Sequence, residues 1–453
     1  MVNPHIFREY DIRGVADRDL TDDVVRAIGL AIGKLVYDSP GPVVVGRDCR
    51  LTSPRIFQAL TDGIRAIADV VDIGIVPTPV TYFAQQHLIA AATVMVTGSH
   101  NPAEDNGLKI MLGDESVHGR AITAIGRRAA ELMARPAQGP RRPMTKESVG
   151  EAYIARAVAE LRLGPRRPKV VVDAGNGSGG PIATALYTEL GFDVEPLYCT
   201  FDGRFPNHHP DPTQPENLAA LIQAVQVTGA EVGIALDGDA DRLGAVDATG
   251  RILWGDQLLV ILGRAILEEL PDATFVAEVK CSQSTYDALP TCEMWKVGHA
   301  LIKERMQKTG AALAGEMSGH LFFAHRWLGF DDGIYAGARL LEVLTRSERT
   351  LAQIADELPR AVNTPEMRID CPDDEKFSVV GRVVESLHAD PRVRTVVTID
   401  GVRATFDDGW GLVRASNTQP ALVIRCEAKN HVTLDAIKAI IDGHVAAAII
   451  GMA

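Results

Sequence analysis

Near its middle the chain reads Val232-Gly233-Ile234-Ala235-Leu236 and continues directly into Asp237-Gly238-Asp239-Ala240-Asp241-Arg242. The first five residues are largely apolar, which predicts a short buried strand. The next six are mostly polar and contain a glycine, which predicts a loop at the end of that strand. A buried strand that ends in a polar loop is the repeating unit of open α/β sheets, so this stretch indicates the fold class.

The same unit recurs along the chain, with helical patterns between the strands. Strands are predicted at 42–46, 70–75, 93–96, 169–173 and 274–279, and helices at 53–68 and 181–191. This alternation predicts parallel sheets that are covered by helices. Because the pattern starts again at Lys169 and at Thr274, we also expect a weak threefold internal repeat.

The length of the chain and the breaks in this pattern predict several domains. A chain of 453 residues is too long for one core, and at roughly 100–200 residues per domain three or four are expected. The breaks fall at 135–143, 247–250 and 358–365. We therefore predict domains at 1–147, 148–250, 251–361 and 362–453. The last changes to short strands with a final helix, which predicts a smaller α+β domain.

The composition argues against several classes of function. With a formal net charge of −13, the surface as a whole repels nucleic acid and acidic membranes, so an anionic substrate needs a local basic pocket. The six cysteines are scattered without a C-x-x-C pair, which argues against a zinc ribbon and a disulfide framework. The N-terminus lacks an apolar signal segment, and the apolar runs fall short of a membrane span. We expect a cytoplasmic protein that binds neither nucleic acid nor membranes.

The loop after the central strand carries carboxylates at alternate positions, Asp237, Asp239 and Asp241. In an extended or looped segment these side chains point to one side, so their oxygens can converge on one hard cation. Without a cation the repulsion between them would be costly. An EF-hand does not fit, because Arg242 stands at its glycine position and Ala248 at its final glutamate position. The small ligand number favours magnesium, and a solvated acidic turn is the alternative.

A second loop of this kind carries a serine. The predicted strand at 93–96 leads into Thr97-Gly98-Ser99-His100-Asn101-Pro102, and Lys109 follows nearby. Ser99 therefore sits among backbone N–H groups that can hold phosphate oxygens. The G-x-S-x-G elbow of hydrolases does not fit, because Asn101 stands at the second glycine position. An ordinary connecting loop is the alternative.

A glycine-rich loop offers a competing function. The run Gly175-Asn176-Gly177-Ser178-Gly179-Gly180 fits G-x-G-x-x-G after a strand, and Asp193 and Glu195 lie near the distance of a ribose-binding acid. This pattern would suit an NAD-dependent dehydrogenase. It is weakened by Pro181 directly after the last glycine and by the position of Glu195 inside a strand-like run. A structural tight turn is the other interpretation.

Two further loops are rich in polar groups. Arg414-Ala415-Ser416-Asn417-Thr418 offers a guanidinium, hydroxyls and an amide, which suit a phosphate. Gly315-Glu316-Met317-Ser318-Gly319-His320 places a carboxylate, a hydroxyl and an imidazole between glycines, which suit sugar hydroxyls. Ordinary surface turns are the alternative for both loops.

Together these segments resemble the α-D-phosphohexomutase superfamily, and within it the phosphomannomutase/phosphoglucomutase branch. The resemblance begins with Phe7-Arg8-Glu9-Tyr10-Asp11-Ile12-Arg13-Gly14. It continues in the family's order through 46–48, 97–102, 106–109, 237–242, 315–320 and 414–418. The matches span nearly the whole chain. Gln419 departs from the family, which commonly has glutamate there.

The resemblance implies four domains around a central cleft. Three are related α/β domains with mixed sheets, and the fourth is a C-terminal α+β lid that clamps phosphate. It implies Mg²⁺ bound by Asp237, Asp239, Asp241 and Ser99, with Ser99 carried as phosphoserine. It places around the reacting phosphoryl group Ser99, Arg13, Lys109, His320, His100 and Arg242. It places around the substrate Tyr10, Lys280, His299, Glu316, Ser318, Arg414, Ser416, Asn417, Thr418 and Arg425.

The implied function is a phosphohexomutase that interconverts hexose 1-phosphate and hexose 6-phosphate, of mannose, glucose or both. A hexose 1,6-bisphosphate would be the intermediate and the activator. Either His320 or Lys109 could take the hydroxyl proton. A phosphoglucosamine mutase is the nearest alternative, although Met317 resembles the mannose/glucose branch. We expect small hexose phosphates as partners and a monomer or a weak dimer.

Overall fold

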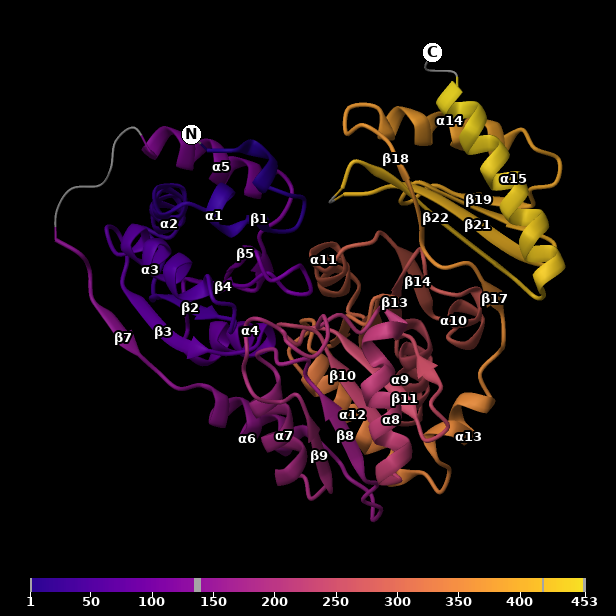
Figure 1. The fold of residues 1–453 in the computed structure, drawn as a ribbon, viewed down its shortest axis with the longest axis horizontal. Helices are drawn as coiled ribbons and strands as arrows, with labels where there is room; N and C mark the ends of the chain where they lie inside the picture. The colour runs from indigo at the N-terminus through magenta and orange to yellow at the C-terminus, as the bar shows by residue number, and fades with distance from the viewer. Residues whose placement is uncertain (1, 134–139, 418, 451–453) are drawn as a thin grey trace.

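The computed structural model describes residues 2–133, 140–417 and 419–450. In this part of the chain the strands form four sheets, each in its own unit with its own helices (Figure 1). The units follow one another from the indigo N-terminal unit to the yellow C-terminal unit. Over the same residues, no helix has the length and apolar character needed to cross a membrane.

The first sheet has the strand order β1 (Ile12–Val15), β5 (Asp105–Leu112), β4 (Ala92–Val96), β2 (Val43–Arg47), β3 (Val70–Ile75) and β7 (Met144–Lys146), and β6 (Glu115–Ser116) pairs with β5. Its helices are α1 (Ala16–Asp19), α2 (Asp22–Leu35), α3 (Ser53–Ile64), α4 (Thr78–His87) and α5 (Arg120–Met133). The predicted strand at 70–75 matches β3, whereas the helix predicted at 53–68 already ends at Ile64.

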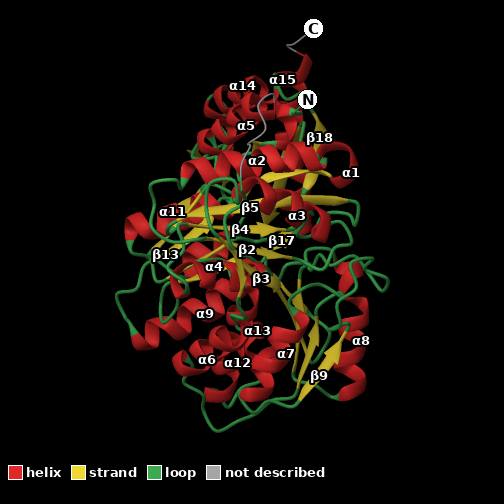
Figure 2. Ribbon diagram, turned by 90° about the vertical axis from the view of Figure 1, so that its left-hand side faces the viewer, coloured by secondary structure: helices red, strands yellow, loops and turns green. Residues whose placement is uncertain are grey.

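The second sheet has the strand order β12 (Ile252–Leu253), β11 (Leu243–Asp247), β10 (Val232–Leu236), β8 (Val170–Asp173) and β9 (Val194–Leu197). The accompanying helices are α6 (Gly150–Glu160), α7 (Gly180–Glu189) and α8 (Ala219–Thr228). Strand β10 is buried along its whole length and matches the strand predicted at 232–236. Figure 2 shows this unit at the end of the molecule opposite the two termini.

The third sheet has the strand order β14 (Cys292–Trp295), β13 (Phe275–Glu278), β15 (Leu313–Gly315) and β16 (Leu321–Phe323). Its helices are α9 (Gly255–Glu269), α10 (Gln283–Ala288), α11 (His299–Thr309), α12 (Gly333–Arg346) and α13 (Leu351–Asp356). The fourth sheet has the order β17 (Val362–Asn363), β22 (Ala421–Ala428), β21 (Gly409–Ala415), β20 (Val402–Phe406) and β19 (Thr395–Val397), and β18 (Met367–Asp370) pairs with β22. Helices α14 (Lys376–His388) and α15 (His431–Ile450) complete this antiparallel unit.

The first three sheets share one topology, which agrees with the predicted internal repeat. In each sheet a central strand, β2, β8 or β13, lies between two parallel neighbours. One of the two neighbours, β4, β10 or β15, is followed along the chain by a strand that pairs with it in the antiparallel direction. These returning strands are β5, β11 and β16, respectively. The sheets are therefore mixed, as the resemblance implies, and not purely parallel, as the alternation alone suggested. The connections to the returning strands are too short for the crossover of about a dozen residues that a parallel pair requires.

These short connections are the loops at 97–104, 237–242 and 316–320. They contain the serine, the aspartate cluster and the polar loop with His320, respectively. Because each precedes the returning strand of its repeat, all three lie at equivalent places in their sheets. The fold thus brings one polar loop from each repeat toward a common region.

Candidate active site

A cleft of about 860 Å³ is lined by side chains from all four units. The described candidate residues that line it are Tyr10, Arg13, Ser99, His100, Lys109, Arg242, Lys280, His299, Glu316, Ser318, His320, Arg414, Ser416, Asn417 and Arg425. The three aspartates of the second repeat lie next to it and are 0% exposed. Thr418, which was expected beside the phosphate, lies outside the described residues.

The serine loop holds Ser99 in an unusual backbone conformation. Its φ is +49°, which is rare for a residue with a side chain. The Ser99 N–H donates to Thr97 Oγ1 at 2.8 Å, and the Gly98 N–H donates to Asp48 Oδ2 at 3.1 Å. The Ser99 hydroxyl then donates to Asp237 Oδ2 at 3.0 Å and lies 3.1 Å from His100 Nδ1. The loop therefore directs the hydroxyl toward the aspartate cluster.

Arg50 fixes this loop from behind. Its side chain is 0% exposed and its Nε lies 3.2 Å from Asp48 Oδ2. The guanidinium donates to the backbone carbonyl oxygens of Ser99, Asn101, Pro102 and Asp105. A Cβ at Gly98 would come within 2.6 Å of the guanidinium, so only glycine fits there. Arg50 was not among the residues expected from the sequence, although it closely follows the family-like 46–48 motif.

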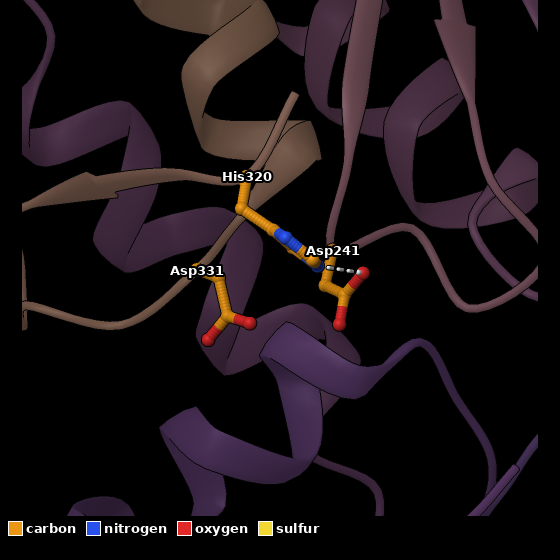
Figure 3. Close-up of side chains that lie close together, drawn as sticks. All are labelled: Asp241, His320 and Asp331. Atoms are coloured by element: carbon orange, nitrogen blue, oxygen red, sulfur yellow. Dashed lines mark ion pairs between the residues drawn. The ribbon is translucent and has the colours of Figure 1, made fainter. Parts of the chain in front are cut away.

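The aspartate cluster has the arrangement expected of a cation site. One carboxylate oxygen from each of Asp237, Asp239 and Asp241 lies within 4.8 Å of the others. Within the described residues, Asp239 Oδ1 is buried without a hydrogen-bond partner, and Asp241 Oδ1 faces His320 Nε2 at 3.2 Å (Figure 3). Burial, and then the charges of Asp241 and Asp239, raise the pKa of Asp237 well above its usual range. A bound cation would relieve this repulsion, so these residues fit a metal ion.

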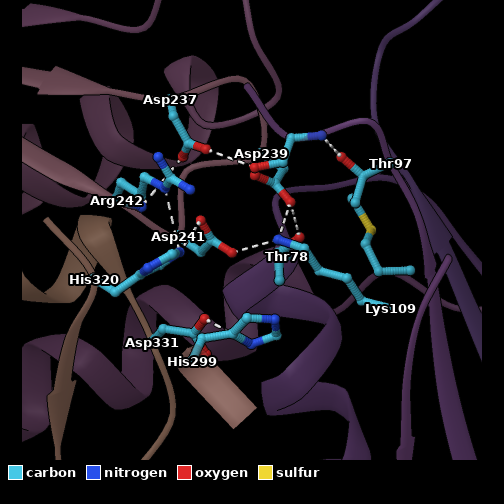
Figure 4. A network of polar contacts seen from close by, with 12 residues as sticks. Thr78, Thr97, Lys109, Asp237, Asp239, Asp241, Arg242, His299, His320 and Asp331 are labelled. Carbon is cyan, nitrogen blue, oxygen red and sulfur yellow. Dashed lines mark hydrogen bonds and ion pairs between the residues drawn. The ribbon is translucent and has the colours of Figure 1, made fainter. Parts of the chain in front are cut away.

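Positive charge surrounds the cluster (Figure 4). Lys109 Nζ donates to Asp239 Oδ2 at 2.7 Å and also to Asp241. Burial favours the neutral form of Lys109, but both carboxylates outweigh it and hold the pKa of Lys109 well above its usual range. The backbone N–H of Arg242 donates to Asp237 Oδ1 at 3.2 Å, and its guanidinium Nε donates to His320 Nε2 at 3.3 Å. On the other side, Arg13 Nη1 donates to Asn101 Oδ1 at 2.9 Å in the serine loop.

The loop of the third repeat places an imidazole beside the cluster. His320 Nε2 lies 3.2 Å from Asp241 Oδ1, and its Nδ1 lies 2.8 Å from Glu316 Oε2. Burial disfavours the charged imidazole, but these two carboxylates outweigh it and raise the pKa of His320 to about 9. The other oxygen of Glu316 accepts from the Gly298 N–H at 2.7 Å. Ser318 Oγ lies 3.3 Å from His320 Nδ1, so this loop is a connected polar unit.

The C-terminal unit faces the cleft with arginines that are already paired. Arg414 Nη2 lies 3.1 Å from Asp400, and Arg425 Nη1 donates to the Lys280 carbonyl at 2.9 Å. Asn417 donates its amide to the Tyr10 hydroxyl, which links the C-terminal unit to the first unit.

Tyr10 also connects the first unit to the third. Its hydroxyl donates to the Val297 carbonyl at 2.6 Å. The next residue is Gly298, whose φ is +129°, and a Cβ there would come within 2.3 Å of the Tyr10 ring. Glycine at this position therefore lets Tyr10 approach. Tyr10 touches two other units at the edge of the cleft.

Models of known families account for nearly the whole chain. Phosphoglucomutase/phosphomannomutase α/β/α domains I, II and III match residues 4–134, 151–250 and 254–362, and the C-terminal domain matches 366–444. This chain belongs to the phosphoglucomutase/phosphomannomutase family.

Relatives with nearly the same length support the assignment to this family. A phosphomannomutase/phosphoglucomutase of Pseudomonas putida is 43% identical over 439 residues, covering 96% of this chain and 94% of that protein. A phosphoglucomutase of Neisseria gonorrhoeae is 42% identical over 448 residues, covering 96% and 95%. The crystal structure of a phosphoglucomutase/phosphomannomutase family protein from Burkholderia thailandensis has a TM-score of 0.91 and 41% identity, covering 99% of this chain and 98% of that chain. The family and the four-domain α/β fold are confirmed.

The glycine-rich loop of this family member has a structural role. Ser178 donates both its N–H and its hydroxyl to the Gly238 carbonyl, at 3.0 and 3.1 Å. A Cβ at Gly177 would come within 2.7 Å of that same oxygen, and one at Gly180 within 2.4 Å of the Cys199 carbonyl. The glycines thus allow the loop to pack against the aspartate loop and the segment at Cys199. This packing supports the tight-turn interpretation rather than a dinucleotide site.

Two segments that the sequence did not single out also line the cleft. One contains His209, Asp211, Thr213 and Gln214, and the other contains Asn363, Glu366 and Arg368. Glu366 Oε2 accepts from Lys280 Nζ at 3.1 Å, and Arg368 pairs with Glu366 at 2.7 Å. The second segment runs from β17 to β18 within the fourth sheet of the family fold. Its proximity to Lys280 arises only in the folded chain, so no local motif could have revealed it.

Proposed function

We propose that this chain is a phosphohexomutase that interconverts the 1-phosphate and 6-phosphate of mannose, glucose or both. The observation that carries the proposal is the Ser99 hydroxyl, held 3.0 Å from Asp237 Oδ2 at one end of a cleft lined by all four units. Phosphoryl transfer depends mainly on positioning and on neutralising charge, and this end of the cleft offers both. The names of the relatives point to the same activity.

Ser99 would carry the phosphoryl group as phosphoserine. Asp237, Asp239, Asp241 and Ser99 Oγ would hold Mg²⁺, which supplies positive charge to the phosphoryl oxygens when bound. Arg13, Lys109 and Arg242 surround the same position and would stabilise charge that develops on the transferred group. His100 would support Ser99 from the adjacent position.

Of the two candidate bases we favour His320. Lys109 lies between two carboxylates that keep its proton bound, since its pKa is held well above its usual range. His320, with a pKa of about 9, is also mostly protonated at neutral pH, but it loses its proton at a lower pH than Lys109 and so offers the larger fraction of free base. Its Nδ1 lies 2.8 Å from Glu316, and this contact fixes the imidazole ring. His320 would therefore accept the proton of the attacking sugar hydroxyl.

The rest of the cleft would read the sugar and its second phosphate. Glu316 and Ser318, with Lys280 and His299, would contact the hydroxyls, while Tyr10 would support the same region. Arg414, Ser416, Asn417, Thr418 and Arg425 would hold the phosphate that is not transferred. A hexose 1,6-bisphosphate would form, turn over in the cleft and return its other phosphate to Ser99. It would also serve as the activator.

The division into domains at 1–147, 148–250, 251–361 and 362–453, with the last acting as a lid, belongs to the same proposal. The lid would close on the phosphate and open to let the intermediate turn. A site that accepts the sugar ring in two opposite orientations can recognise only those groups of the sugar that occupy the same positions in both orientations. The O3 and O4 hydroxyls exchange places in that motion, so Glu316 and Ser318 would read that pair.

A coupled assay with four hexose 1-phosphates tests the proposal. Mannose and glucose differ at C2, outside the pair that is read, so their specificity constants should agree within roughly tenfold. Galactose inverts O4 and would leave Glu316 poorly satisfied, at a cost of about 1–3 kcal/mol. A preference for glucosamine 1-phosphate would favour the phosphoglucosamine mutase. Absence of turnover with all four would contradict the proposed activity.

A further inference from the structure

The short connection between β13 and α10, residues 279–282, is bound by two units of the chain at once. It contains Lys280, whose side chain lines the cleft. Figure 1 shows β13 and α10 beside the C-terminal unit. The N–H groups of the connection donate within the third unit, to the carbonyls of Trp295 and Glu278 and to the carboxylates of Glu278 and Asp256. The third unit therefore holds one side of this main chain.

The carbonyl groups of the same connection are bound by the C-terminal unit. Arg403 Nη1 donates to the carbonyl of Val279 at 2.7 Å and to the carbonyl of Cys281 at 2.8 Å. Arg425 Nη1 donates to the carbonyl of Lys280, which stands between these two residues, at 2.9 Å. One guanidinium thus binds the main chain on both sides of Lys280. The position of Lys280 therefore depends on the C-terminal unit as well as on its own unit.

Arg403 is itself held firmly in this contact. It is 1% exposed, and its guanidinium carbon lies 3.8 Å from the centroid of the Trp410 ring. Its Nη2 donates to Gln283 Oε1 at 3.2 Å, at the start of α10. A guanidinium that lies on an aromatic ring keeps the N–H groups in its plane available for carbonyl oxygens. Arg403 can therefore fix the connection, although the described residues that line the cleft do not include it.

We propose that Arg403 is a positioning residue of the substrate site. By binding the carbonyls on both sides of Lys280, it sets where the Lys280 ammonium lies in the cleft. Arg403 and Arg414 stand on the paired strands β20 and β21, so one unit holds the second phosphate and also places the lysine that contacts the sugar. The contact of Lys280 with the sugar belongs to the proposed function, and this inference rests on it.

Arg403→Lys tests this role by steady-state kinetics. Lysine keeps the charge but is shorter and has no planar group to lie on Trp410, so it cannot bind both carbonyls as the guanidinium does. KM for glucose 1-phosphate or mannose 1-phosphate should rise roughly tenfold, because a buried carbonyl loses its partner and Lys280 shifts. Lys280 contacts the substrate in the ground state as well as in the transition state, so kcat should stay within about threefold. An unchanged KM would overturn the proposal.

Arg382→Lys is the matched control for this variant. Arg382 also belongs to the C-terminal unit, but its Nε donates to the Ala448 carbonyl of the same unit at 3.0 Å. The control should therefore leave KM and kcat unchanged. An equal rise in KM in Arg382→Lys and Arg403→Lys would show a general weakening of the C-terminal unit and would contradict a specific role of Arg403.

Two double variants show through which residue Arg403 acts. Combined with Lys280→Ala, Arg403→Lys should raise KM by less than about twofold, because the group that it positions is already absent. Combined with Arg414→Ala, it should raise KM by the full factor that is seen in the parent. A full effect beside Lys280→Ala, or a lost effect beside Arg414→Ala, would assign Arg403 to the phosphate clamp and refute the proposal.

Hydrogen exchange tests the same contact without substrate. Amide exchange in a peptide that spans 279–283 should be roughly tenfold faster in Arg403→Lys, while a peptide that spans β10 exchanges as in the parent. Equal exchange at 279–283, or faster exchange in both peptides, would overturn the proposal whatever the activity. If only 279–283 exchanged faster and the parent turned over no hexose phosphate, the proposed function would fail while Arg403 would still be shown to hold the connection.

Discussion

The two ends of the cleft are built differently. One cluster of buried side chains spans the first three units, from Val44 to Leu358, and the first unit has a second cluster of its own, from Ile6 to Ala129. The C-terminal unit has a core of its own. It meets the third unit through a small apolar cluster around Val279, Trp410 and Leu412. The end with the proposed chemistry therefore lies on units that share part of their core, whereas the phosphate clamp lies on a unit whose core is separate.

The polar contacts follow the same division. Ser99, Thr78 and Lys109 of the first unit all bind aspartates of the second, at 3.0, 2.6 and 2.7 Å. The C-terminal unit instead binds the third unit, where Arg403 donates to the Val279 and Cys281 carbonyls at 2.7 and 2.8 Å. It also contacts the cleft through side-chain pairs such as Asn417–Tyr10 and Glu366–Lys280. Chemistry needs fixed geometry, and release of a turning intermediate needs a clamp that opens. We therefore expect variants at the end with Ser99 and the aspartates to lower kcat, and variants at the phosphate clamp to change KM.

The largest effect is expected for Ser99→Ala. This variant lacks the hydroxyl that points at the aspartates, so kcat should fall roughly 10⁴-fold or more. Intact mass and peptide mapping of the parent should find phosphate on Ser99. Ser178→Ala, which removes a buried hydroxyl from the adjacent loop but keeps its backbone donor, is the matched control. Phosphate on another residue, or near-normal turnover in Ser99→Ala, would refute the carrier role.

Arg50→Lys tests whether the serine loop must be held rigidly. Lysine keeps the charge but cannot bind four carbonyl oxygens, so the Ser99 hydroxyl should shift from the aspartates. A displacement of this size should lower kcat roughly 100-fold while KM changes little, since Arg50 does not line the cleft. The coupled assay measures both constants. Arg47→Lys is the control, because Arg47 pairs with Asp72 at 2.7 Å rather than with the loop.

A loss of stability alone would not produce this pattern. In Arg50→Ala, added guanidinium should restore part of the turnover by occupying the vacated position, and it should do nothing for Ser99→Ala. If kcat fell equally in Arg50→Lys and Arg47→Lys, the arginines near the serine loop would act only through stability. The proposed difference between the two ends of the cleft would then lose this support.

Much of the end of the cleft that carries Ser99 and the aspartates could be predicted from the sequence, because each of its motifs is a short run of consecutive residues. Strand β10 is buried along its length, so its apolar run is uninterrupted and its bounds were predicted correctly. The aspartates and Ser99 lie directly after such strands. Loops after equivalent strands meet in space, and the threefold restart at Lys169 and Thr274 indicated this equivalence.

Other parts depend on contacts between distant residues. Arg50 reaches loop carbonyls about fifty positions away, and Glu366 meets Lys280 across 86 positions. The alternation of strands and helices did not reveal the antiparallel strands, because it carries no information on the direction of the final strand. Such features require the folded chain.

Arg414→Ala tests the second end. Its guanidinium is expected to bind the phosphate that is not transferred, in the ground state as well as in the transition state, so KM should rise more than kcat falls. Losing a hydrogen bond to a charged group costs about 1.5–3 kcal/mol, which corresponds to a rise in KM of roughly 10- to 100-fold. Arg394→Ala, which removes an exposed arginine of the same unit, should leave both constants unchanged. A fall in kcat at constant KM would assign Arg414 to the chemistry.

Glu366→Gln should have the smallest effect and addresses the contact between the C-terminal unit and Lys280 of the third unit. Burial opposes ionisation of Glu366, but Lys280 and Arg368 outweigh it and lower its pKa to about 2 from a usual value of 4.5. Because the folded pKa is the lower one, the pair stabilises the protein above about pH 4.5 and loses that contribution only as the pH falls toward 2. Within the usual assay range the pair is therefore intact, and substrate must compete with Glu366 for Lys280.

Removing this competitor should lower KM by roughly two- to fivefold, which is the range of a partly exposed ion pair. The ratio of KM between parent and variant should stay constant from about pH 5 to pH 8, because Glu366 does not titrate there. Glu357→Gln, which breaks an exposed pair with Arg349 in the segment before β17, is the control. If Glu366→Gln instead lowered kcat and left KM unchanged, the contact between Glu366 and Lys280 would hold the closed, reactive arrangement. The clamp would then share in fixing the geometry of the chemistry, and the two ends of the cleft would differ less than their cores suggest.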